Sequence, residues 1–204
     1  MFRLLFLLPL AAALGGCMTV LSARQGDDLP QEKLRDDSKS IVLLHTSLHE
    51  SYCLNISLTL AQQNAAGEWV KADTLNIKGQ LDLAKLPSQF VLPAGEYGIV
   101  NVACLSPRIS RRAFIAKQLT RGSVWDGSRA TFEKPFATFK VLPGEVVDIG
   151  SLRMPSTPQQ YRVPGKFIAV VTAIPDDYLG NLAAKNPDLY QRRVTRPMQA
   201  AIRI

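Results

Sequence analysis

Apolar and polar residues alternate with the two-residue period of β-strands over much of the chain after residue 40. The clearest alternation covers residues 52–60, where every second side chain is apolar or aromatic. These side chains are Tyr52, Leu54, Ile56, Leu58 and Leu60. The pattern predicts a half-buried strand, with Cys53 on the opposite face. A continuous apolar run at residues 41–44 predicts a further strand before it.

Turn-forming residues divide the strand patterns that follow. Residues 64–68 predict a turn, and residues 69–72 and 74–77 predict the strand that returns from it. Two later segments, residues 90–100 and 139–150, are near copies: each has an aromatic residue, Leu-Pro, Gly and Glu, and then apolar positions. We interpret them as two turns of the same chemistry that lead into two strands.

The last part of the chain changes to a helical pattern. Residues 166–174 predict a strand, and Pro175, Asp176 and Asp177 then predict a helix start, because acidic side chains are favourable there. Residues 186–188 break this helix and predict a second one from Leu189 to about Val194. Three cations lie late in that segment, where they are favourable. They are Arg192, Arg193 and Arg196.

Strands come first and helices last, so we expect a mainly β fold: an antiparallel β-sandwich with a short C-terminal helical appendage. The Leu-Pro turns at residues 92–95 and 142–145, with the strands after them, resemble those of transthyretin-like and carboxypeptidase-regulatory-like modules. The resemblance is limited to these two segments. It implies a small antiparallel sandwich and carries no catalytic residue.

The N-terminal residues have a composition of their own. Arg3 precedes an apolar run at residues 4–14, which is shorter than the roughly 20 residues of a membrane-spanning helix. The run ends in Leu14-Gly15-Gly16-Cys17, which resembles the lipobox of bacterial lipoproteins. This resemblance implies that residues 1–16 are a signal peptide and that Cys17 carries a diacylglycerol and an acyl chain. An ordinary cleaved signal peptide with an unrelated cysteine is the alternative.

The lipobox resemblance also implies a compartment. Met18 stands where an Asp would favour the inner membrane in enteric bacteria, so we expect a lipid anchor in the outer membrane and a domain facing the periplasm. Residues 17–38 lack an apolar period and predict a flexible tether after the lipidated cysteine. Residues 39–204 then form the β-sandwich domain with its C-terminal helices.

Composition narrows the class of protein rather than the activity. The 204 residues are 47% hydrophobic and 20% charged, as in an ordinary globular domain, and carry a formal net charge of +7. A basic surface favours anionic neighbours, although charge that only maintains solubility is the alternative. We expect the membrane as a partner through the lipid, and an envelope protein as a further one. Nucleic acid is not expected, because no recognition motif is present and the compartment lacks it.

Two cysteines remain besides Cys17. In an oxidising compartment Cys53 and Cys104 are expected to form a disulfide, which would add about 3–4 kcal/mol of stability on the chain-entropy model. Two independent buried thiols are the alternative.

Few residues suggest catalysis. His45 and His49 are the only histidines, but no His-Glu-x-x-His motif accompanies them, so no metal site is expected. Ser123 lies in a Gly-rich loop with Trp125, but Arg121 replaces the first Gly of a nucleophile motif. We therefore predict no catalytic residue and no cofactor.

The most basic segment covers residues 108–121 and is the candidate site for an anionic ligand. Its cationic side chains are Arg108, Arg111, Arg112, Lys117 and Arg121. A solvated strand or loop face is the alternative interpretation. The sequence therefore predicts a non-catalytic envelope interaction or scaffold module. The alternatives are a module that binds lipid phosphate, lipopolysaccharide or glycan, and a hydrolase without a recognisable motif.

Overall fold

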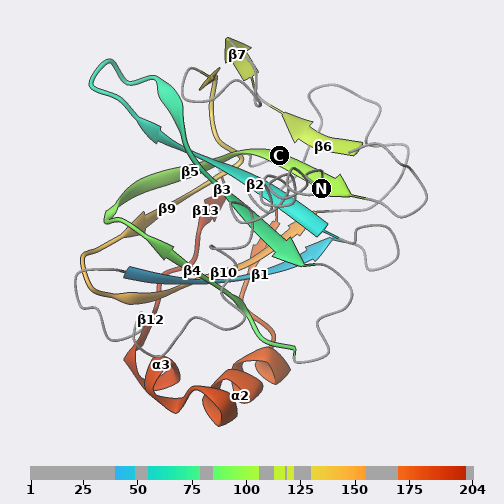
Figure 1. Ribbon diagram of the computed structural model, residues 1–204, viewed down its shortest axis with the longest axis vertical. Coiled ribbons are helices and arrows are strands. Elements are labelled where there is room, and N and C mark those ends of the chain that lie inside the picture. Colours follow the sequence, from blue (N-terminus) through green and yellow to red (C-terminus); the bar gives the residue numbers. More distant parts are fainter. Residues whose placement is uncertain are drawn as a thin grey trace, which may run out of the picture.

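The computed structural model describes residues 40–48, 55–78, 85–105, 113–117, 119–121, 130–154 and 170–200. Within these residues the chain forms two β-sheets and two helices, which lie in three layers (Figure 1). The expected fold class, mainly β with a small helical appendage, is confirmed. No helix in the described ranges is long and apolar enough to cross a bilayer.

Sheet A has the order β4-β1-β10. Two short strands, β11 and β12, pair with different parts of the outer edge of β10, at residues 151–153 and 146–148. Its strands are β1 (Ser40–Leu48), β4 (Ser88–Leu92), β10 (Val146–Met154), β11 (Val170–Thr172) and β12 (Arg193–Thr195). The pairs β1–β10 and β10–β12 are parallel, whereas the others are antiparallel. The sheet is therefore mixed, which the expectation of an antiparallel sandwich did not include.

Sheet B has the order β13-β9-β5-β2-β3-β8-β7, with β6 beside β5, and all its pairs are antiparallel. The first strands in chain order are β2 (Asn55–Gln63), β3 (Trp69–Lys78), β5 (Gly95–Leu105) and β6 (Ala113–Lys117). The others are β7 (Leu119–Arg121), β8 (Thr131–Phe132), β9 (Ala137–Val141) and β13 (Gln199–Ala200).

The main hydrophobic core lies between the two sheets. The alternation predicted for residues 52–60 is confirmed for the part that the structure describes, because Ile56, Leu58 and Leu60 are all buried in this core. The opposite face of β2 is not fully solvated, however. Thr59 is buried there, and its hydroxyl oxygen accepts a hydrogen bond of 3.2 Å from the Asn101 amide of β5.

The predicted turn between β2 and β3 is confirmed, and a side chain organises it. The side-chain oxygen of Asn64, Oδ1, accepts hydrogen bonds from the backbone N–H groups of Ala66 and Glu68 at 3.0 and 2.9 Å. Gly67 adopts a positive φ of 78°, which suits a residue without a Cβ.

The two near-copy segments both cross between the sheets. The first leads from β4 in sheet A to β5 in sheet B, and the second leads from β9 in sheet B to β10 in sheet A. At the first crossing, the Tyr97 hydroxyl donates to the Pro93 carbonyl at 2.8 Å, like the tyrosine corners of other β-sandwiches. At the second, Gly144 has a φ of 68°, and the Leu142 N–H donates to the Glu145 carboxylate at 2.6 Å. Both segments lead into a strand, as predicted, but the two turns differ: Gly144 has a positive φ and Gly95 does not, and different side chains hold them.

Helices α2 (Asp176–Lys185) and α3 (Pro187–Arg192) cover the outer face of sheet A (Figure 1). Leu182 and Leu189 are their fully buried residues, and they pack with Ile41, Leu43 and Val146 of the sheet. The start of α2 agrees with the prediction. An ion pair of 3.1 Å between Lys85 Nζ and Asp177 adds a contact between α2 and the segment before β4.

The ends of the predicted elements differ in this region. The strand expected over residues 166–174 is described as a strand only at residues 170–172. The helix expected from Leu189 to Val194 starts earlier, because Pro187 suits the first helical turn, and it ends at Arg192. Residues 193–195 instead extend beside β10, and residues 199–200 beside β9. Neither of these strands was predicted.

Candidate binding surface

The outer face of sheet B carries a pocket of about 280 Å³ where β2, β3 and β5 meet. Gln62, Gln63, Trp69 and Glu96 line it. Gln63 and Trp69 are register partners on β2 and β3, so their side chains share one face of the sheet. Trp69 also packs against a small apolar cluster. Its members are Ala61, Val100, Ala130 and Phe132.

Two glycines of β5 make room for this pocket. A Cβ atom on Gly98 would lie 2.6 Å from Pro135 Cβ and 2.9 Å from Trp69 Cζ3. A Cβ atom on Gly95 would lie 2.5 Å from the amide nitrogen of Gln62. Because real Cβ atoms do not approach so closely, each of these contacts needs a glycine in β5. Gly95 and Gly98 are three residues apart, so the contacts lie on opposite faces of the strand: the Gln62 amide lies on the face of Tyr97, and Trp69 lies on the other face.

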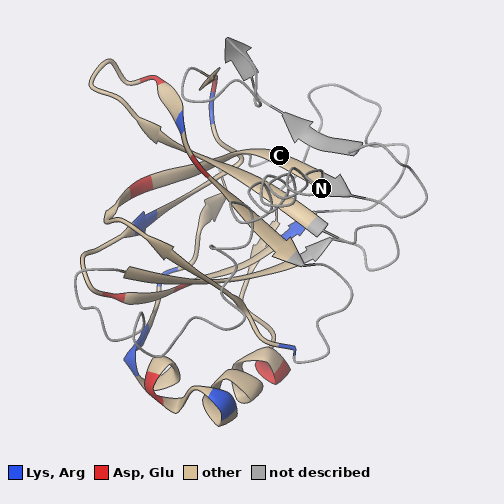
Figure 2. Cartoon of the chain, viewed as in Figure 1, with Lys and Arg blue, Asp and Glu red and all other residues tan. Residues whose placement is uncertain are grey.

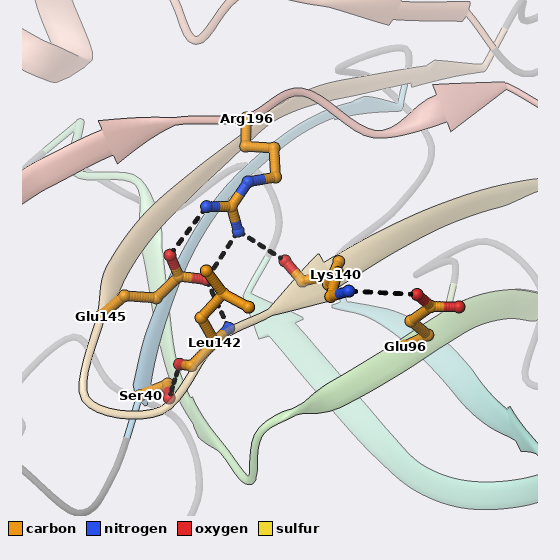
Figure 3. Close-up of polar contacts among 6 residues, drawn as sticks. All are labelled: Ser40, Glu96, Lys140, Leu142, Glu145 and Arg196. Atoms are coloured by element: carbon orange, nitrogen blue, oxygen red, sulfur yellow. Dashed lines mark hydrogen bonds and ion pairs between the residues drawn. The ribbon is translucent and has the colours of Figure 1, made fainter.

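The charge beside the pocket is balanced. Lys140 of β9 is the register partner of Glu96, and its Nζ lies 3.5 Å from the Glu96 carboxylate (Figure 3). Both side chains are more than half exposed, so the pair contributes little to stability. It does, however, place one negative and one positive group at the rim of the pocket.

A second set of contacts holds the turn between β9 and β10 (Figure 3). The Arg196 guanidinium donates to both oxygens of Glu145, at 2.7 and 3.0 Å, and to the Lys140 carbonyl at 3.2 Å. The Ser40 hydroxyl donates to the Leu142 carbonyl at 2.5 Å. The hydrogen bonds that Arg196 donates to Glu145 raise the pKa of its guanidinium. The residues around β12 therefore fix the end of β9, which is the strand that presents Lys140.

His45 and Ser151 form the described contact most similar to a catalytic pair. They are register partners on β1 and β10, and His45 Nδ1 lies 2.7 Å from Ser151 Oγ. The Tyr178 ring packs edge-on against the imidazole, with 4.5 Å between the ring centroids. Ser151 is only 1% exposed, so a substrate could not reach its hydroxyl. The geometry is that of a buried link between strands. His49 lies outside the described residues, and no cluster of potential metal ligands occurs within them.

Asp148 of β10 is a buried carboxylate. Its Oδ1 accepts a hydrogen bond from the Gly150 N–H at 2.9 Å. Its Oδ2 lies 3.5 Å from Arg193 Nε, and these two atoms form an ion pair without a hydrogen bond. Burial raises the pKa of Asp148, although the Gly150 N–H and the Arg193 charge oppose this. Gly150 has a φ of 88° at an irregularity in β10, and a Cβ there would lie 2.7 Å from the Thr172 carbonyl. These groups shape the strand rather than an open site.

The structure does not describe most of the residues that the sequence singled out. Outside the described residues are Cys17, Cys53, Arg108, Arg111, Arg112, Ser123 and Trp125. Cys104, Lys117 and Arg121 are placed only as backbone positions of β5, β6 and β7. The lipid site, the disulfide and the basic ligand site therefore stay predictions. In the described part of the chain, acidic and basic residues are interspersed (Figure 2).

Sequence reasoning missed the pocket because its members belong to three separate strands. Trp69 and Glu96 stood in segments that were interpreted only as strands. The signal available was the pair of glycines in β5, since a glycine within a strand indicates a close approach of another group. A comparison of the chain with protein-family models, curated proteins and solved structures finds no match.

Proposed function

We propose that this chain is a lipid-anchored lipoprotein of the bacterial outer membrane, whose periplasmic β-sandwich holds an envelope component without catalysis. The proposal joins the lipobox at residues 14–17 to one structural observation. Helices α2 and α3 close the outer face of sheet A, whereas the outer face of sheet B presents the pocket at Trp69. A domain with one covered face and one hollowed face suits a module that binds through the second face.

The described polar groups support a non-catalytic role. Ser151 is buried and hydrogen-bonded to His45, and Glu145 binds Arg196 in the turn between β9 and β10. Both contacts stabilise the sandwich. The pocket itself holds amides, an indole and a carboxylate, and these groups recognise ligands by hydrogen bonding and packing.

The test is site-specific photo-crosslinking in intact cells, with a crosslinking amino acid at Gln63 in the full-length chain. The matched control carries it at Gln191, an exposed glutamine of α3. We expect an adduct with an envelope protein or a glycan from position 63 and none from position 191. Equal products from both positions, or none from position 63, would refute the proposed binding surface.

The anchor is tested separately. Cys17→Ser should prevent lipid labelling and leave the protein unprocessed or released from membranes. Normal lipid labelling of this variant would refute the lipobox assignment, whatever the crosslinking shows.

A further inference from the structure

The lining of the pocket restricts the chemistry of its ligand. Three of the four lining side chains are polar, and the only charge among them is the Glu96 carboxylate. Among the residues that the structure describes, no lysine or arginine lines the pocket, and Lys140 at the rim is paired with Glu96. A phosphate or sulfate group would meet a negative charge here. A wholly apolar ligand would bury amides that need hydrogen-bond partners.

The Gln63 amide is available for a ligand. The Gln62 amide lies over Gly95, on the other face of β5 from the indole, so the hydrogen-bonding groups on the face of the indole are those of Gln63 and Glu96. The Gln63 amide donates only a long bond of 3.3 Å to the Gly67 carbonyl. Gln63 offers donors and an acceptor, while Glu96 offers acceptors alone. This combination matches a ring of hydroxyl groups, which both donate and accept.

The indole supplies the other half of such a site. Trp69 is half-buried, with part of its surface against the apolar cluster and part at the pocket. An aromatic ring packs well against the C–H groups of a sugar ring, whose edge is polar. The volume of about 280 Å³ is below the range of pockets that enclose drug-sized ligands, which suits a single ring.

We propose that the pocket formed by Gln62, Gln63, Trp69 and Glu96 binds one ring of a neutral saccharide. The sugar packs on Trp69, and its hydroxyl groups exchange hydrogen bonds with Gln63 and Glu96. The inference rests on the proposed function in that both use the outer face of sheet B. It names the class of ligand that this face takes: an uncharged envelope glycan.

The test measures saccharide binding by the purified full-length chain. A polyoxyethylene detergent is used, because maltoside detergents carry saccharide headgroups. The probes are a neutral β-linked N-acetylhexosamine trisaccharide and a neutral α-linked glucose trisaccharide. Saturation-transfer NMR reports binding, and in a Trp125→Phe background the fluorescence of Trp69 reports occupancy of the pocket. We expect saturable binding of at least one probe with a Kd between about 0.1 and 10 mM, insensitive to salt because the ligand is neutral.

The variants locate the binding. Gln63→Ala and Glu96→Ala each should weaken it about tenfold, as expected when a hydrogen bond to the ligand is lost. Both positions are outside the hydrophobic core, so these variants should fold even if Trp69→Leu does not. Gln191→Ala in α3 removes the same group as Gln63→Ala and should change Kd less than about twofold.

Several results would overturn the inference. These are no saturable response to either trisaccharide, an affinity that is unchanged in Gln63→Ala and Glu96→Ala, or a response only to tetramethylammonium or inorganic phosphate. Tetramethylammonium is included because a carboxylate beside an indole is also the chemistry of a cation site. If saccharides fail to bind while position 63 crosslinks to an envelope protein in cells, the saccharide inference falls and the proposed function stands.

Discussion

The close packing at Gly98 gives the most direct test of the structure around the pocket. In Gly98→Ala, the new methyl carbon would lie 2.6 Å from Pro135 Cβ and 2.9 Å from both Pro135 Cγ and Trp69 Cζ3. Carbon atoms in contact prefer separations of about 3.5–4.0 Å, so the shortfall is about 1 Å on the proline side. The proline ring is part of the backbone, and Trp69 is held by the apolar cluster. Neither neighbour can move away easily.

The expected loss of stability follows from two opposing effects. Overpacking of this size lowers the free energy of unfolding by about 1–3 kcal/mol. Replacing glycine by alanine restricts the unfolded chain and returns about 0.4–1 kcal/mol, since the φ of Gly98 is not positive. Gly98→Ala should therefore be less stable by about 1–2 kcal/mol.

The assay is urea unfolding followed by far-UV circular dichroism, with the slope of the transition expected to stay unchanged. Gly180→Ala is the matched control, because Gly180 lies in α2 and a Cβ there meets no atom within 4 Å. This variant should gain about 0.5–1 kcal/mol from helix propensity. If Gly98→Ala is as stable as the wild type while Gly180→Ala behaves as expected, the close approach of Trp69 and Pro135 to β5 is wrong.

Four further predictions concern the core, the turn, the buried acid and the cysteines. Leu182→Ala should lower the free energy of unfolding by about 2–5 kcal/mol in urea, because it empties a fully buried position under α2; a loss below about 1 kcal/mol would contradict the docking of the helix. Glu145→Ala should cost about 1–2 kcal/mol and Glu145→Gln less, since glutamine still accepts the N–H bond in the turn; equal losses would argue against that bond. Burial raises the pKa of Asp148 above 3.8, so the folded state holds this proton more tightly than the unfolded state does. The free energy of unfolding of the wild type should therefore fall relative to that of Asp148→Asn as pH rises from about 3 to 6. A wild-type value that stays constant or rises relative to the variant would contradict this. Peptide mapping without reductant should join Cys53 to Cys104, and two thiols that alkylate in native protein would refute the disulfide.

Local patterns in the sequence predicted the elements that depend on neighbouring residues. The alternation at Ile56, Leu58 and Leu60 gave β2 and its buried face, and Asn64 with Gly67 gave the turn after it. The acidic start of α2 was recognised in the same way. In each case the physical cause lies within a few residues of the element.

The parts that were missed depend on contacts between distant residues. An apolar run such as residues 41–44 predicts a strand but does not say that β10 will pair with it in parallel. Residues 193–195 and 199–200 are too short to show a period, and they are strands only because β10 and β9 lie beside them. The pocket needs Gln62, Trp69 and Glu96 together, and only the pairing of their strands achieves that.

The two short strands after α3 have a consequence for the order in which the protein matures. β12 joins sheet A and β13 joins sheet B, so residues 193–200 attach to both halves of the sandwich. These residues follow every other described strand along the chain, and β1 must also wait for the much later β10 before it can pair fully. Pairing between strands so far apart in the chain forms slowly. A chain proposed to cross a membrane before it folds would benefit, because the nascent protein lacks the segments that close its two sheets until all the other described strands have been made.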